Sequence, residues 1–452
     1  MANLLNIKWG FLMKSRKNTI ATQIKQIYHN LLSKYEMAKR LVNYVGREGD
    51  LAKYASIMLI ATLIAGVCNY VYQIYMGVAL GPEDYGVFGA LFAIFYIISI
   101  LGGTIQTSMT RFVSKLKAED DYGNIGFLLS GMTKRMAILG VLAFFIFVLA
   151  SPHITSFLNM EAKEPVIIVG ATLLFSLLLP VGLGVLQGLQ RFVQLGMNGV
   201  LNASLKLLFG IILVSVGFGV SGALGAVVIA TVFALIAALV PVRSLFKQKS
   251  SEFDFFGLYK YTFPAMVAMF CFTVPANVDV IIVKHFFAAH DAGLYTATSV
   301  LGKIIIFLPM AISKVMFPKV SEMHTQNKGT FGLLNRCLIY TGMLSGVAAI
   351  GCFFFPFSVA KLVFGSEYIG AAPLIRLYGV AMFFFSLTVV VMFYNLAVHS
   401  LGYVYIFAFF TFLLIGLLSL FHSSMMEMIT ILVVIEVMLF FSSYLYTVQQ
   451  SA

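Results

Sequence analysis

The sequence predicts an all-α polytopic membrane protein, with about 12 transmembrane helices in two pseudo-symmetric six-helix lobes. Of its 452 residues, 60% are hydrophobic and only 11% are charged, and the mean hydropathy is +0.95. The apolar stretches are long and uninterrupted, whereas a membrane barrel would show short alternating strands. Residues 51–116 also align with residues 258–323 without a gap, with 17 identities in 66 positions, which indicates an internal duplication.

Each predicted span holds about 20 predominantly apolar residues, the number that a helix needs to cross the hydrocarbon core. The predicted spans are 54–79, 87–109, 132–151, 165–187, 194–217, 219–241, 262–286, 293–317, 333–356, 372–395, 401–421 and 425–447. Four prolines interrupt three of them: Pro180 in the fourth span, Pro264 and Pro275 in the seventh, and Pro309 in the eighth. A proline removes a backbone hydrogen bond, so these positions are candidate hinges or ion-binding kinks.

The duplication sets the expected domain organisation. Six spans per half is an even number, so both halves enter the membrane from the same side and the repeats are parallel. We expect a cytoplasmic basic segment (1–50), an N-terminal lobe (51–243), a cytoplasmic linker (244–261) and a C-terminal lobe (262–452). Repeats of this kind place a functional cavity between the two halves, which is typical of transporters that work by alternating access.

The placement of the cations predicts the topology. With the N-terminus inside, the inner segments hold 24 of the 30 Lys and Arg residues and the outer segments hold three. This asymmetry follows the positive-inside rule, so we expect a multi-pass protein of the cytoplasmic (plasma) membrane with both termini cytoplasmic. Membrane topology therefore explains the net charge of +12, and a nucleic-acid partner is not expected.

Residues 18–46 form a predicted basic amphipathic helix, with apolar residues at helical spacing flanked by lysine and arginine. We expect it to lie on the inner leaflet, held by apolar burial and anionic lipid. Docking of cytoplasmic partners is the alternative role.

Neither a metal site nor an enzyme active site is expected. The four cysteines fall in or beside spans without metal-ligand spacing, and no loop is long enough to fold as a catalytic domain. The acidic run from Glu119 to Asp121 could mimic paired carboxylates, but it lies in a short lysine-rich loop and is interpreted as a solvated turn. A polysaccharide polymerase or ligase would need a large outer loop with Arg or His, and the outer loops here are short.

Several motifs spread over nearly the whole chain resemble one transporter family. They are LGPEDYGVF at 80–88, TRFVS at 110–114, LQRF at 189–192, DVIIV at 279–283, DAGLYTA at 291–297, and FGSEY at 364–368 with Ala372-Pro373. They resemble the O-antigen-type polysaccharide flippases of the multidrug, oligosaccharidyl-lipid and polysaccharide exporter superfamily. The resemblance implies a V-shaped, MATE-like pair of six-helix lobes. It also implies a cargo, an oligosaccharide linked through phosphate or pyrophosphate to a polyprenol and moved from the inner to the outer leaflet.

The anionic linkage of such a cargo needs a cation, because an unpaired charge in a low-dielectric medium is costly. Three cations lie inside predicted spans: Lys303 and Lys206 near the midplane, and Arg376 at the start of a span. Intramembrane charge is by default a functional candidate. The alternative for Lys303 is a structural ion pair with Asp279 or Glu436, and for Arg376 it is interfacial anchoring.

The sugar needs hydrogen-bonding groups and aromatic faces. Candidates in the spans are Asn69, Gln73, Gln106 and Asn277, and Asn202 belongs to a polar stripe on the helix of Lys206. The alternative is hydrogen bonding between helices, which uses the same residue types.

Energy must come from somewhere, since no phosphate-binding glycine loop is present, and no cofactor other than a candidate coupling ion is expected. Asp279 and Glu436 are the intramembrane carboxylates that could bind Na⁺ or H⁺. The alternative for both is pairing with Lys303 or Lys206. A cation-coupled multidrug exporter of the same fold is the second functional hypothesis. Its cavity should be acidic, whereas here midplane lysine matches or outnumbers midplane acid.

Overall fold

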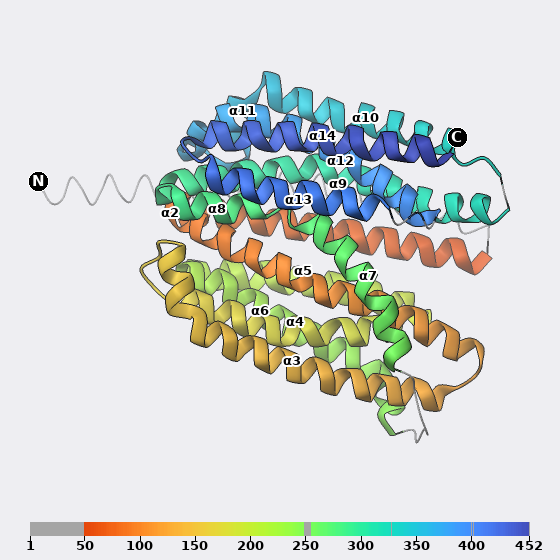
Figure 1. The fold of residues 1–452 in the computed structure, drawn as a ribbon. Helices are drawn as coiled ribbons and strands as arrows, with labels where there is room; N and C mark the ends of the chain where they lie inside the picture. Colours follow the sequence, from red (N-terminus) through yellow and green to blue (C-terminus); the bar gives the residue numbers. More distant parts are fainter. Residues whose placement is uncertain (1–48, 248–254, 327, 399, 401, 452) are drawn as a thin grey trace, which may run out of the picture. The chain divides into compact units, whose positions relative to one another are not determined.

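The computed structural model describes residues 49–451, apart from 248–254, 327, 399 and 401 (Figure 1). The chain divides into two compact units, Met1–Ile64 and Ala65–Ala452, and all packing contacts given below lie within the second. The predicted helix at 18–46 and part of the predicted linker fall outside the described residues. Across the described ranges the chain is helical and contains no strand, which confirms the all-α prediction.

The helices follow the predicted spans closely. The first half contains α2 (Gly49–Ala118), α3 (Tyr122–Phe157), α4 (Glu164–Gly188), α5 (Phe192–Ser215), α6 (Gly219–Leu239) and the 3₁₀ helix η1 (Val240–Lys247). The second half contains α7 (Phe255–Thr273), α8 (Val278–Phe286), α9 (Ala289–Thr325), α10 (Phe331–Phe354), α11 (Pro356–Phe364), η2 (Ser366–Ala371), α12 (Ala372–Ala397), α13 (Tyr403–Leu420) and α14 (Met425–Ser451). Nine helical segments of the described residues are long and apolar enough to cross a membrane, and the total of about 12 spans stays a prediction.

Helix α2 contains the first two predicted spans, joined by a kink rather than a loop. Gly81 has non-helical angles (φ 75°, ψ 169°) and Pro82 follows it. Glycine adopts this left-handed region at no steric cost, and proline, which has no N–H, fits the start of the next helix. The kink therefore divides α2 into two segments, at a position between the first two predicted spans.

The predicted seventh span, 262–286, is not one helix. The chain leaves helical geometry between Thr273 and Val278, so the span is divided into α7 and α8. Pro275 lies in this break, where its missing N–H cannot continue the ladder. The other predicted proline interruptions, Pro180, Pro264 and Pro309, lie inside continuous helices.

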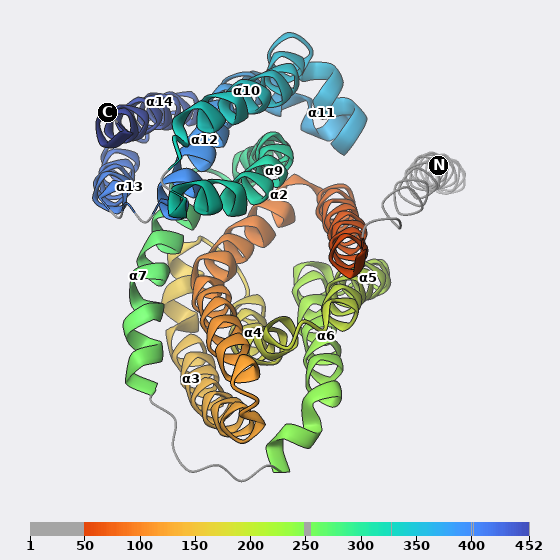
Figure 2. The same ribbon diagram turned by 90° about the vertical axis from the view of Figure 1, so that its right-hand side faces the viewer.

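Within each half, the helices pack against consecutive helices and against helices further along the chain. In the first half α4 packs against α3 and α6, and α6 packs against α5 (Figure 2). In the second half α12 packs against α9, α10 and α14. Helix α7 contacts both halves: it packs on α13, and Phe255 lies under the guanidinium of Arg135 in α3, with 3.5 Å from Cζ to the ring centroid.

The two copies of the repeat meet through small residues. A Cβ added to Gly86 would lie 2.9 Å from the backbone nitrogen of Gly293, which is its counterpart 207 positions later. A Cβ on Gly293 would collide with the carbonyl oxygen of Pro82. One turn further on, Gly89 faces its own counterpart, Thr296, with no room for a side chain. The part of α2 that follows Gly81 therefore packs against α9, and the two segments are related by a local two-fold axis.

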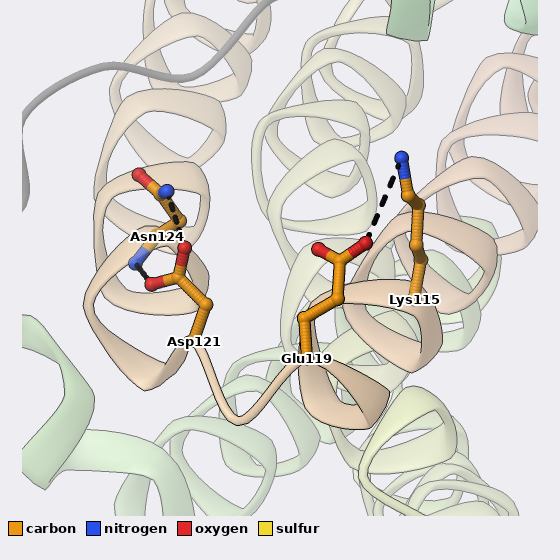
Figure 3. A network of polar contacts seen from close by, with 4 residues as sticks. All are labelled: Lys115, Glu119, Asp121 and Asn124. Atoms are coloured by element: carbon orange, nitrogen blue, oxygen red, sulfur yellow. Dashed lines mark hydrogen bonds and ion pairs between the residues drawn. The ribbon is translucent and has the colours of Figure 1, made fainter.

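The acidic run after α2 is a turn that ends one helix and starts the next (Figure 3). Asp121 is the N-cap of α3, and its carboxylate accepts hydrogen bonds from the backbone N–H (2.9 Å) and the side-chain amide (2.6 Å) of Asn124. Glu119 forms an exposed ion pair with Lys115, one turn earlier, at 3.9 Å. These carboxylates cap and solvate helix ends, which agrees with the interpretation as a turn.

This turn provides a stability prediction. Because Asp121 caps α3, Asp121→Ala is expected to destabilise the protein by about 1 kcal/mol, seen as a lower Tm in detergent. Glu119→Ala, the matched control, removes an exposed pair and is expected to change stability by less than about 0.5 kcal/mol. Equal Tm values for the two variants would contradict the capping role of Asp121.

Candidate functional site

A cavity of about 430 Å³ lies between the two copies of the repeat. Eight lining residues come from the first copy: Gly66, Asn69, Tyr70, Gln73, Gly89, Phe92, Ala93 and Tyr96. Their counterparts 207 positions later line it as well: Thr273, Ala276, Asn277, Val280, Thr296, Ser299, Val300 and Lys303. Phe272, Ile306 and Phe385 complete the lining. The cavity therefore lies on the local two-fold axis, where the duplication predicts a functional cavity.

Lys303 is the cation in this lining. It lies on α9, half-buried, and its Nζ donates a hydrogen bond to Oδ1 of Asn277 at 3.0 Å. Among the described residues it forms no ion pair within 4.0 Å with Asp279, although the two charges interact electrostatically. The expected alternative, a direct ion pair, is absent from this conformation. The ammonium is left available to a cavity anion.

Asp279 lies beside the cavity in the first turn of α8 and is fully buried. Its Oδ2 accepts hydrogen bonds from the hydroxyls of Tyr378 (2.8 Å) and Tyr295 (3.1 Å). Oδ1 has no hydrogen-bond partner among the described residues. The two tyrosines hold the carboxylate in place and leave one oxygen free to bind a proton or a cation.

Glu436 is the second buried carboxylate of this half. It lies on α14 at 1% exposure, and its Oε2 has no hydrogen-bond partner among the described residues. It interacts electrostatically with Asp279 and Tyr378, so the two acids share one environment. Two acids in one buried environment are costly to ionise together, which makes them a candidate cation-binding site.

Lys206 is buried behind the cavity wall of the first half. Its Nζ lies 4.8 Å from the ring centroid of Tyr72 and 5.7 Å from that of Phe92. Ring faces stabilise a cation when it is withdrawn from water. Phe92 lines the cavity and Lys206 does not, so a shift of this ring is needed before the lysine reaches a cavity ligand.

The remaining predicted residues divide into two groups. Asn69 and Gln73 line the cavity, on the first-copy side with Tyr70 and Tyr96. The other three predicted residues are absent from the lining: Gln106 donates to Gln187 (3.1 Å), Arg376 is exposed with Cζ 5.5 Å from the Phe353 ring centroid, and Asn202 is half-buried on α5.

The sequence analysis missed four tyrosines. Tyr295 and Tyr378 fix Asp279, and Tyr70 and Tyr96 line the cavity. The internal repeat could have predicted Tyr70 and Tyr96, because these two tyrosines align with the candidate site residues Asn277 and Lys303. Nothing in the sequence marks Tyr378, since α12 lies outside the aligned segment.

Comparisons with known proteins agree on family and fold. Residues 76–373 match the model of a family described as polysaccharide biosynthesis protein. The uncharacterized membrane protein MJ1375 of Methanocaldococcus jannaschii is 22% identical over 330 residues, covering 68% of this chain and 75% of that protein.

Solved structures share the fold at low sequence identity. An inward-facing multidrug resistance MATE family transporter of the MOP superfamily superposes with a TM-score of 0.74 at 14% identity, covering 87% of this chain and 97% of that one. The lipid II flippase MurJ, in an inward closed conformation, gives 0.69 at 15% identity and covers 87% of each chain. The MATE-like architecture is therefore confirmed.

Proposed function

The chain belongs to the polysaccharide biosynthesis protein family, and from that premise we propose that it flips a polyprenyl-(pyro)phosphate-linked oligosaccharide from the inner to the outer leaflet. The observation that carries the proposal is the cavity on the repeat axis, where Lys303 has no direct carboxylate partner in the described part of the chain. Lys303 binds the phosphate linkage, and the opposite wall offers amides and aromatic rings to the glycan. The protein acts as a transporter and not as an enzyme.

The side of the wall formed by the first copy suits a carbohydrate. Asn69 and Gln73 provide donors and acceptors, and Tyr70, Phe92 and Tyr96 provide ring faces. Sugars combine hydroxyls with apolar C–H faces, so a pocket of mixed amides and rings matches both. The cavity volume of about 430 Å³ is enough for one or two sugar rings but not for a prenyl chain, which stays in lipid.

Asp279 and Glu436 supply the coupling in this proposal. A buried acid pair with unpartnered oxygens binds Na⁺ or H⁺ in one conformation and releases it in the other, which biases the alternating-access equilibrium. In this proposal both termini are cytoplasmic and the protein lies in the cytoplasmic membrane, which the positive-inside distribution of Lys and Arg supports. Other polysaccharide-assembly proteins are the proposed partners of the basic N-terminal segment.

Reconstitution tests the function directly. Liposomes holding a fluorescent polyprenyl-pyrophosphoryl oligosaccharide are expected to show a protein-dependent rise in the fraction of label that an external quencher reaches. The rise should depend on an imposed Na⁺ or pH gradient, and Asp279→Asn should remove that dependence. Absence of flipping under every gradient, together with efflux of an organic cation, would favour the multidrug exporter, which the buried acids could also serve.

A further inference from the structure

The break between α7 and α8 is built around one amide side chain. Helix α7 ends at Thr273 and α8 begins at Val278, with Pro275 between them. Asn277 closes the end of α7, because its Nδ2 donates to the carbonyl of Thr273 at 2.8 Å. The same side chain is buried, at 6% exposure. Its orientation is therefore set by the backbone of the break.

The other end of this amide holds Lys303. Oδ1 of Asn277 accepts the hydrogen bond from Nζ at 3.0 Å, so one side chain links the last carbonyl of α7 to the cavity lysine on α9. A hydrogen bond to a charged group is worth more than a neutral one, and burial strengthens it further. The position of the lysine ammonium thus depends on the geometry of the break.

A competing partner for Lys303 lies close by. Asp279 follows Asn277 by two residues, keeps one oxygen without a partner among the described residues, and interacts electrostatically with Lys303. Two opposite charges in a low-dielectric site attract strongly, so a direct pair would be expected unless the lysine is held elsewhere. In this conformation Asn277 holds it.

We propose that Asn277 is a positioning residue that keeps Lys303 available for the cargo anion and away from Asp279. When residues 274–277 rearrange, the Asn277 amide moves away from Lys303. The Lys303 ammonium then pairs with Asp279, and the cargo anion is released. This inference rests on the proposed function, because the anion is the phosphate linkage of the cargo. Release of the cargo anion from Lys303 then needs no competing ion from solution, because the Asp279 carboxylate takes the place of the anion.

Helix α7 is placed to drive this rearrangement. The hydroxyl of Thr262 lies 2.7 Å from that of Ser108 in α2, and Phe255 packs on α3, so the first part of α7 contacts the N-terminal half. Beyond the break, α8 packs against α9 and α13 in the C-terminal half. Any relative movement of the halves therefore acts on the segment that orients Asn277.

The chemical reactivity of Lys303 tests the proposal without any cargo. Purified protein is treated with a small water-soluble amine-acylating reagent, and acylation of Lys303 is followed by mass spectrometry. Asn277→Ala should slow acylation by at least about tenfold, because the ammonium pairs with Asp279. Adding Asp279→Asn to that variant should restore the rate to within about threefold of wild type.

The controls separate positioning from general damage. Asn198→Ala removes another buried amide, which donates to the carbonyl of Ala234 at 2.7 Å, and should leave Lys303 acylation unchanged. Acylation of Lys206, measured in the same digests, shows whether a variant makes buried lysines more accessible in general. An unchanged rate in Asn277→Ala, or a slow rate that Asp279→Asn does not restore, would overturn the proposal.

Flipping rates of the same variants distinguish a failure of this inference from a failure of the proposed function. Asn277→Ala should raise the KM for the fluorescent lipid by about tenfold, and the double variant should bind well but release slowly, with a reduced kcat. Wild-type protein that fails to flip would refute the function, while the acylation rates would still decide whether Asn277 positions Lys303. Normal flipping with unchanged acylation would refute the inference alone.

Discussion

Lys303→Ala is expected to lower the rate of lipid-linked oligosaccharide flipping by about 100-fold or more, with normal insertion and folding. The cargo phosphate would enter a low-dielectric cavity with no cation to bind it, and removal of one partner of a buried pair costs about 3–5 kcal/mol. Lys303→Arg should keep more than a tenth of the activity, because the charge is retained and only its geometry changes. Initial rates in the quenching assay provide the measurement.

A matched cation change shows whether the effect is local. Arg376 is exposed, and its guanidinium lies over Phe353 rather than in the cavity. Arg376→Ala is expected to change flipping by less than about twofold, since an exposed interfacial charge contributes little. Full activity of Lys303→Ala would remove this lysine from the anion path, whereas a large loss in Arg376→Ala would place a second anion site outside the cavity.

Gly293→Ala is expected to produce the largest loss of stability. The new Cβ would collide with the carbonyl oxygen of Pro82, a backbone atom that cannot turn aside. Overpacking of this kind costs about 1–3 kcal/mol, more than the ~1 kcal/mol that alanine gains over glycine in a helix. We expect a clearly lower Tm in detergent and a smaller yield of monodisperse protein.

Gly103→Ala is the control for this substitution. Gly103 lies on α2 with no heavy atom within 4 Å of an added Cβ, so alanine should be neutral or slightly stabilising. Equal stability of Gly293→Ala and Gly103→Ala would show that the crossing of α2 and α9 tolerates separation. A loss of flipping in Gly293→Ala without loss of stability would place the effect on movement between the halves.

The sequence was sufficient for the helices and the repeat, but not for how the seventh span is divided. Pro275 marks a weak point, since it cannot donate to the ladder. Whether the chain resumes the same helix beyond it depends on the packing of α8 against α9 and α13, which no local signal reports. The same limit explains why Pro180 and Pro264, with the same chemistry, leave their helices continuous.

For the candidate site residues, the sequence predicted the position of each residue along its helix. It did not predict the side of the helix to which the side chain points. Lys303 and Lys206 are both near the middle of their helices, yet only Lys303 faces the cavity. Which way a side chain points is decided by the neighbouring helices, and Lys206 is turned toward Tyr72 in its own half. Gln106 likewise pairs with Gln187. Residues inside the duplicated segment were placed better, because symmetry adds a constraint that single residues lack.

The alignment of the two copies also has a consequence for cargo polarity. Asp279 and Lys303 of the second copy align with Tyr72 and Tyr96 of the first. An ancestor made of two identical chains would have offered two equivalent poses to any guest. In this chain the second copy carries the charges and the first carries neutral rings at the aligned positions, so a head-to-tail molecule would have a single orientation with its ionic group against the second copy. The difference between the two copies thus makes the two sides of the cavity chemically distinct.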